Sequence, residues 1–326
     1  MLQTEKVLQM AEARRKRKKP ETLNLKQFAV WSAAPTPLTD DMRVHTGDVR
    51  RMIDHHFRLG IDGLFLAGTN GEGPWLPEGE KRILVRTAVE HVKGTLKIAV
   101  QVTDNSTARI LDNIRAAADD GADIAVIAPP TFFMNATPST LKKHYIDAIR
   151  ASSLPIGIYD RGDFGPVKVP VAVLSAVYAE KNVVMVKDSS TKPDNARCAL
   201  DSRKKRPGLR LLNGFEFGCV EYLTQGYNGM LLGGGVFNGY LARMILDAVR
   251  SGDIRLAHRL QKRMNRIMYA IYGGRNISCW LAGEKKLLVE MGLFSTWNNF
   301  PRYPLTKSCI RAIERVLRED ADVLLP

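Results

Sequence analysis

The sequence is poor in cysteine and has no long apolar run, and both absences narrow the class of protein. Its 326 residues include four cysteines, which lie far apart and form no Cys-x-x-Cys pair. This spacing argues against a zinc ribbon, a redox motif or a dense disulfide framework. No apolar stretch approaches the roughly 20 residues that span a bilayer, and no signal-peptide core follows the basic run from Arg14 to Lys19. We therefore expect a cytoplasmic protein with reduced thiols and no membrane partner.

Acidic residues and histidine pairs are also scarce. The chain has 34 Asp and Glu against 48 Lys and Arg, a net charge of +14. The electrostatic field of this positive charge could attract nucleic acid or anionic metabolites. Because no nucleic-acid recognition motif accompanies the charge, we expect a solvated surface and no nucleic-acid partner. The six histidines show no metal-ligand spacing, so we expect neither a metal site nor a cofactor.

Short apolar runs alternate with helical segments from about residue 25 onward, which is typical of repeated βα units. Expected strands are Phe28 to Ala34, Gly63 to Leu66, Lys97 to Val102, Asp123 to Ile127, Pro155 to Tyr159, Val183 to Val186, Leu209 to Leu212 and Gly229 to Leu232. Eight units favour a closed (β/α)8 TIM barrel. The alternative, an open doubly wound sheet, normally has a Gly-rich phosphate turn after its first strand, and this chain lacks one there.

The chain divides into three predicted parts. Residues 1–22 form a basic N-terminal arm and residues 23–251 form the barrel. Residues 252–326 form a helical C-terminal extension, with helices expected at 255–272, 284–291 and 307–318.

Lys187 is the strongest candidate for a catalytic residue. It directly follows the apolar run from Val183 to Val186, and reactive groups of TIM barrels lie at the carboxyl ends of strands. Burial disfavours a charged ammonium, so a neutral, nucleophilic amine becomes accessible there. The same pattern also fits a lysine that reaches the barrel rim or pairs with Asp188.

Other strand ends supply candidate partners for Lys187. Tyr159 closes the fifth expected strand and could act as a general acid or base, or be a rim residue with a solvated hydroxyl. Gly68, Thr69 and Asn70 begin a glycine-rich turn after the second strand, whose backbone amides could approach an anion. Gly234 lies in a glycine run after the eighth strand that would also permit close contact with a ligand. Either glycine-rich segment could instead be only a tight connection.

Together, these motifs resemble the dihydrodipicolinate synthase and N-acetylneuraminate lyase superfamily. The resemblance rests on Gly68-Thr69-Asn70-Gly71-Glu72, Pro129-Pro130, Tyr159 and Lys187, in this order. It covers about Trp31 to Tyr240 and extends less specifically through the tail.

The resemblance implies a TIM barrel, usually a homotetramer, whose lysine forms an imine with pyruvate or a related 2-oxo acid. By this resemblance Lys187 forms the imine, Tyr159 shuttles protons and Thr69 joins the proton relay. Thr69 and Asn70 would hold the substrate carboxylate. The partner is then a small 2-oxo acid, and the assembly is a homo-oligomer, either a tetramer or a dimer.

Two departures from the family pattern bear on the substrate. Members that make dihydrodipicolinate carry an aromatic hydroxyl after the fourth strand, where this chain has Phe132 and Phe133. They also carry an arginine a few residues beyond the tyrosine, where Arg161 comes too early and Phe164 lies nearer the expected place. We therefore expect a catabolic lyase or aldolase acting on a hydroxylated or deoxy 2-oxo acid. The alternatives are a dehydratase of a ketodeoxy sugar acid and a non-enzymatic ligand-binding barrel.

Overall fold

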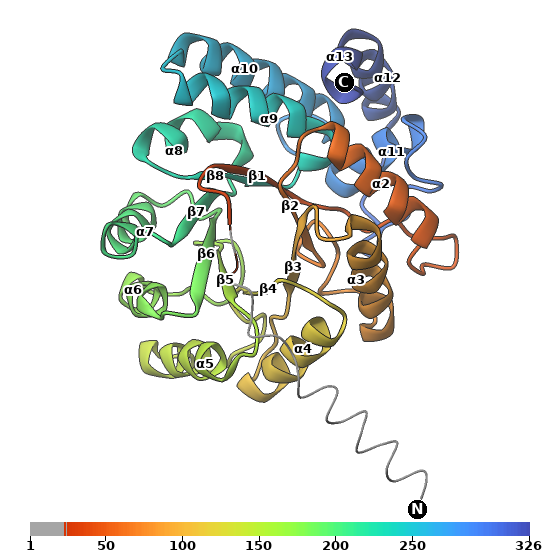
Figure 1. Ribbon diagram of the computed structural model, residues 1–326. Coiled ribbons are helices and arrows are strands. Elements are labelled where there is room, and N and C mark those ends of the chain that lie inside the picture. The colour runs from red at the N-terminus through yellow and green to blue at the C-terminus, as the bar shows by residue number, and fades with distance from the viewer. Residues whose placement is uncertain (1–22, 24) are drawn as a thin grey trace, which may run out of the picture.

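Eight parallel strands close into a barrel in chain order, β1 to β8, in a computed structural model that describes residues 23 and 25–326 (Figure 1). The strands are β1 (Ala29–Ala33), β2 (Gly63–Leu66), β3 (Lys97–Gln101), β4 (Ile124–Ile127), β5 (Ile156–Asp160), β6 (Val183–Asp188), β7 (Arg210–Asn213) and β8 (Gly229–Leu232). The predicted TIM barrel is confirmed. The basic arm predicted for residues 1–22 lies outside the described residues.

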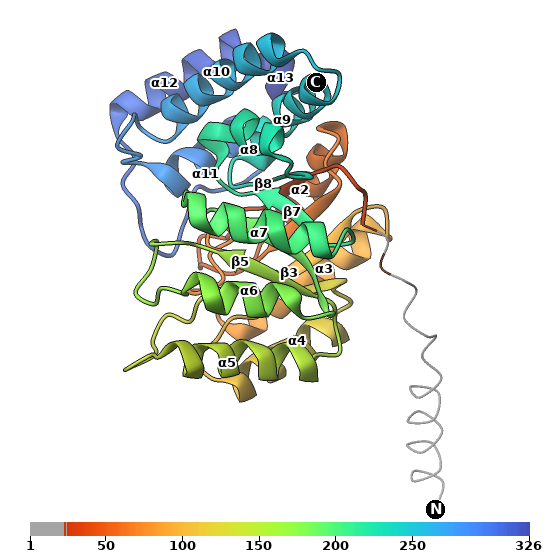
Figure 2. The same cartoon turned by 90° about the vertical axis from the view of Figure 1, so that its left-hand side faces the viewer.

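Helices surround the barrel and continue beyond it. The surrounding helices are α2 (Thr46–Arg58), α3 (Glu78–Val92), α4 (Thr107–Asp119), α5 (Pro138–Ala151), α6 (Val171–Ala179), α7 (Pro193–Lys205), α8 (Cys219–Gln225) and α9 (Gly235–Arg250), with a short 3-10 turn η1 (Glu216–Gly218) before α8. The chain then forms α10 (Ile254–Ile271), α11 (Trp280–Glu290), α12 (Lys307–Glu319) and α13 (Ala321–Leu324). Figure 2 shows α10, α12 and α13 stacked on the side of the barrel that α8 and α9 cover. The helical extension is thus present, and α11 begins four residues earlier than predicted.

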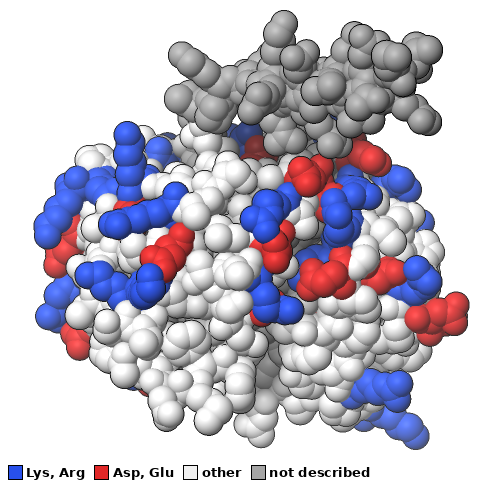
Figure 3. Space-filling model, turned by 90° about the horizontal axis from the view of Figure 1, so that it is seen from below, with Lys and Arg blue, Asp and Glu red and all other residues white. Residues whose placement is uncertain are grey.

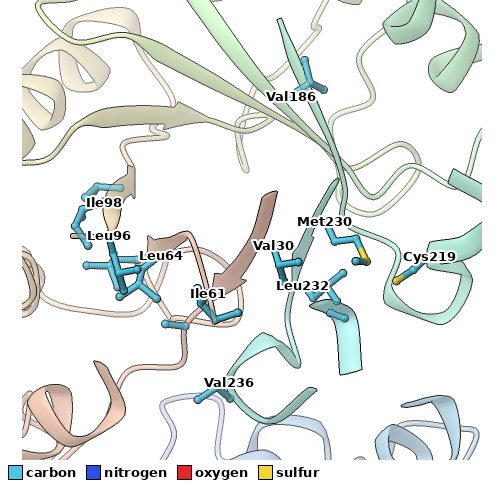
Figure 4. Close-up of a cluster of buried hydrophobic side chains, with 14 of the residues drawn as sticks. Val30, Ile61, Leu64, Leu96, Ile98, Val186, Cys219, Met230, Leu232 and Val236 are labelled. Atoms are coloured by element: carbon cyan, nitrogen blue, oxygen red, sulfur yellow. The ribbon is translucent and has the colours of Figure 1, made fainter. Parts of the chain in front are cut away.

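Two apolar cores follow from the alternation of side chains along each strand. One lies inside the barrel and includes Trp31, Phe65, Tyr159 and Met185. The other lies between the strands and the helices and runs on into the C-terminal helices. Figure 4 shows part of this outer layer, to which the side chain of Val186 belongs.

An irregularity in β6 decides which way Lys187 points. Ile156 pairs with Val183, but the next residue, Gly157, pairs with Met185, so β6 carries one extra residue there. Such a bulge exchanges the faces of all later residues in the strand. Met185 therefore faces the barrel interior, and so does Lys187 two positions on.

The charged surface mixes both signs. On the face shown in Figure 3, Lys and Arg side chains lie among Asp and Glu side chains. Salt bridges such as Arg82–Asp120 and Arg150–Glu180 join helices across the surface. Within the described part of the chain, no helix is both long and apolar enough to cross a membrane.

Candidate active site

Lys187 lies opposite Tyr159 in the barrel wall. The two residues pair in register between β5 and β6, and the Lys187 side chain has an exposed fraction of only 5%. Its amine lies 4.4 Å from the centre of the Tyr159 ring and 5.3 Å from that of Phe65. An amine held against two aromatic faces is fixed in position while its nitrogen keeps its hydrogen-bonding capacity.

Asp188 is not the partner of Lys187. Its carboxylate accepts hydrogen bonds from the Ser190 amide and the Tyr227 hydroxyl, and its side chain is fully buried on the outer face of the barrel. Among the residues that the structure describes, no carboxylate lies within salt-bridge distance of Lys187. The amine is therefore free to meet a carbonyl group.

Gly214 makes the space that the Lys187 side chain occupies. A Cβ atom at this position would lie 3.0 Å from Lys187 Cε and 2.1 Å from Ser189 Oγ. Any larger residue must therefore displace one of these side chains. The sequence offered one signal for this role, a glycine two positions after the expected seventh strand.

Tyr159 is tuned by its neighbours. Burial raises the pKa of its phenol, but the positive charges of Lys187 and Arg161 and side-chain hydrogen bonds with Ser189 and Thr69 outweigh burial, so the pKa lies below its usual value. A phenol with a lowered pKa gives up and takes back a proton more readily near neutral pH. The structure thus brings together the three residues that we predicted as catalytic.

The turn after β2 is held by its own buried side chains. The Asn70 side-chain amide donates to the carbonyls of Ala33 and Gly233, at 2.9 and 3.1 Å, and to Glu284. Glu72 forms a fully buried ion pair with Lys285 of α11. The NH₂ group of Asn70 is thus committed to hydrogen bonds within the protein. Gly68 packs on Phe65, where an added Cβ would lie 2.7 Å from the ring.

Gly234 is joined to a buried carboxyl group. Its amide donates to Glu216 at 2.7 Å, and the Tyr272 hydroxyl donates to the other oxygen of the same carboxyl group at 2.9 Å. Burial raises the pKa of Glu216, against the effects of these hydrogen bonds and the charge of Lys187.

A cavity of about 360 Å³ opens beside Thr69. Its walls come from the segments that follow β2, β3, β4 and β5, and its polar lining includes Gln101, Thr103, Asn105 and Arg161. Phe132 lies outside it and is 67% exposed, while the ring of Phe133 packs against His144. The cavity beside Thr69 therefore carries polar side chains, and neither phenylalanine lines it.

Arg161 is the cation of this cavity that lacks a counter-ion. The nearby carboxylate of Asp163 pairs with Lys168 and Lys192, and that of Asp104 pairs with Arg109. Within the described ranges, no salt bridge involves the Arg161 guanidinium, whose charge acts instead on Tyr159. An unpaired guanidinium in a polar cavity is suited to bind an anion.

Metal-ligand side chains do not cluster in the described part of the chain, where no three His, Cys, Asp or Glu residues could hold an ion. A buried lysine can supply the nucleophile of imine chemistry, and a phenol beside it that is joined to a hydroxyl can supply the proton transfers. The fold and the site therefore define the class as Schiff-base lyases on TIM barrels.

The comparisons with known proteins agree with this class. The sequence profile of the dihydrodipicolinate synthetase family matches residues 26–319, and the chain belongs to this family. A 4-hydroxy-tetrahydrodipicolinate synthase of Anaeromyxobacter is 27% identical over 73% of this chain and 80% of its own. The dihydrodipicolinate synthase structure from Bacteroides thetaiotaomicron has a TM-score of 0.82 at 26% identity and covers 91% of this chain and 99% of its own.

A third relative was solved with a ligand. YagE, an Escherichia coli prophage protein of the same family, was solved in complex with pyruvate, with a TM-score of 0.80 at 19% identity over 91% of this chain and 99% of its own. The predicted family and the predicted assignment as a lyase or aldolase are confirmed.

Proposed function

We propose that the protein cleaves a hydroxylated or deoxy 2-oxo acid through an imine on Lys187. The observation that carries the proposal is the Lys187 amine held on the Tyr159 ring without a carboxylate partner. The amine attacks the C2 ketone, the carbonyl oxygen leaves as water, and an imine forms.

Tyr159 then moves the protons of the reaction. Its phenolate takes the proton of the C4 hydroxyl as the C3–C4 bond breaks. The electron pair of that bond flows into the protonated imine, which becomes an enamine as an aldehyde leaves. The enamine takes up a proton at C3 and water releases pyruvate, so no cofactor is required. Hydrogen bonds with Thr69 and Ser189 hold the phenol for both transfers.

The polar cavity beside Thr69 favours a substrate with a polar distal end. We assign Arg161 to an anionic or polyhydroxylated group there, since its guanidinium has no counter-ion among the described residues. Backbone groups of Gly68, Thr69 and Asn70, and of the segment around Gly234, would surround the carboxylate at the reacting end. The Asn70 side-chain amide and the Gly234 backbone amide, which are hydrogen-bonded within the protein, would hold these segments in place.

Borohydride reduction in the presence of pyruvate tests the proposal. The reduced adduct should appear on the peptide that contains Lys187 and vanish in Lys187→Arg. A matched control, Lys192→Arg, removes a nearby lysine that pairs with Asp163 and should keep the adduct. Unmodified Lys187 at saturating pyruvate would refute the proposal. With ketodeoxy sugar acids, pyruvate plus an aldehyde indicates cleavage, and a dehydrated product without pyruvate indicates a dehydratase.

We also propose that the protein works in the cytoplasm as a homo-oligomer, either a tetramer or a dimer. The exposed apolar side chains of Phe132 and Met134, which are 67% and 74% accessible, support a contact between copies at this loop. Light scattering on the purified chain measures the mass, and a monomer at all concentrations would exclude the assembly.

A further inference from the structure

Glu284 is a fully buried acid that the proposed reaction does not use. Helix α11 places it behind the turn after β2, where its Oε1 atom accepts a hydrogen bond of 3.1 Å from Asn70 Nδ2. The same NH₂ group also donates to two backbone carbonyls, those of Ala33 and Gly233, so its two hydrogens are shared among three acceptors. These carbonyls fix the amide orientation, because exchanging its nitrogen and oxygen would set Oδ1 against two acceptors.

Two buried oxygens in this pair lack a hydrogen-bond donor. They are Asn70 Oδ1 and Glu284 Oε2, the second oxygen of each group that shares the bond. A buried acceptor without a donor loses its hydrogen bonds to water without replacement, and a buried charge loses more. A proton on Glu284 Oε2 supplies the missing donor, because a carboxylic acid and a primary amide can form two antiparallel hydrogen bonds in a ring. In such a ring, one proton would satisfy both oxygens.

The charges around Glu284 also favour its neutral form. Burial raises the pKa of Glu284 well above its usual value, and the carboxyl groups of Glu216 and Glu72 raise it further. The Asn70 hydrogen bond and the Lys285 charge oppose this effect without overcoming it. Lys285 is already engaged, since it pairs with Glu72 and donates to the Asn298 carbonyl at 2.6 Å.

We propose that Glu284 is a neutral carboxylic acid in the folded protein, and that its paired hydrogen bonds with Asn70 position the turn that carries Thr69. The functional part of this inference rests on the proposed imine chemistry. A 2-oxo acid brings a carboxylate close to this turn, and a neutral acid behind Asn70 avoids repulsion between two buried anions. Glu284 is thus a positioning residue, supplied to the barrel by the C-terminal extension.

Infrared difference spectroscopy tests the protonation state without reference to activity. The wild-type protein should show the C=O band of a buried, protonated carboxyl group, shifted in D₂O and missing in Glu284→Gln. The matched control is Glu290→Gln, which changes an acid of the same helix that pairs with Lys286 at the surface. That variant should keep the band. Absence of the band from the wild-type protein at neutral pH would overturn the proposal, whatever the enzyme assay gives.

Kinetics test the positioning role. Glu284→Gln can replace the acid–amide ring with an amide–amide ring, so kcat/KM for cleavage and the rate of pyruvate trapping should stay within about twofold of wild type. Glu284→Ala should raise KM and slow trapping about tenfold or more while the protein remains folded by circular dichroism. A folded Glu284→Gln variant as impaired as Glu284→Ala would show that the negative charge is needed. If the wild type traps no pyruvate while the infrared band is present, the imine function fails and the protonation assignment stands.

Discussion

Gly214→Ala tests whether the Lys187 side chain needs the space that the structure gives it. The new Cβ would lie 2.1 Å from Ser189 Oγ, where an ordinary contact begins at 3.4 Å, so the serine must move by more than 1 Å. It would also lie 3.0 Å from Lys187 Cε, which requires a smaller shift of the amine. Both groups act on Tyr159, by hydrogen bond and by charge.

The expected loss is larger in activity than in stability. A displacement of about 1 Å at a reacting group can lower the rate about 100-fold, while overpacking destabilises a protein by about 1–3 kcal/mol. We expect Gly214→Ala to lower kcat/KM and the rate of borohydride trapping by about two orders of magnitude. Trapping with pyruvate and unfolding in urea measure the two effects separately.

Gly79→Ala is the matched control. Gly79 lies in the first turn of α3, and nothing lies within 4 Å of a Cβ added there. The control should keep full activity and gain up to about 1 kcal/mol of stability, because alanine favours helix. If Gly214→Ala traps pyruvate at the wild-type rate, the packing that we infer around Lys187 is refuted.

Three further predictions concern the phenol, the cavity and the helix α2. Tyr159→Phe should lower kcat by about 10²–10⁴-fold, and an unchanged rate would exclude the phenol as the proton carrier. Arg161→Ala should raise KM most for substrates with an anionic distal group and affect pyruvate trapping less, through the lost effect of its charge on Tyr159. Arg109→Ala, whose charge Asp104 already neutralises, should change neither. Burial lowers the pKa of His55 from 6.5 to about 4 and that of His56 to about 3, so the unfolded chain binds protons first as the pH falls below 6.5. Stability should therefore fall by about 2 kcal/mol per histidine between about pH 7 and about pH 5, and urea unfolding of His55→Gln should show a shallower fall than wild type.

The sequence predicted the barrel and its main candidates because each strand and helix carries its own periodicity. Lys187 and Tyr159 could be found from their places at strand ends, and Thr69 from the turn after the second strand. The bulge in β6 could not be found this way, because the run from Val183 to Val186 is uniformly apolar. Only the pairing with β5 shows that the strand holds an extra residue.

The contacts of the helical extension also could not be predicted from the sequence. Tyr272 and Glu216 are 56 positions apart, and no periodic pattern links them. Glu284 was the first residue of an expected helix, where an acid is ordinarily solvated. The helix begins at Trp280, so Glu284 lies within it, on the face that packs against the barrel. That face could be recognised only once the tail was placed on the barrel.

The buried ion pair between Glu72 and Lys285 limits how the barrel and the C-terminal extension can be recombined with those of other proteins. It joins the turn after β2 to α11, and both side chains are fully shielded from water. Loss of either partner leaves an unpaired charge in the interior and lowers the free energy of unfolding by about 3–5 kcal/mol. A chimera that takes its barrel or its C-terminal extension from a relative should therefore keep both Glu72 and Lys285.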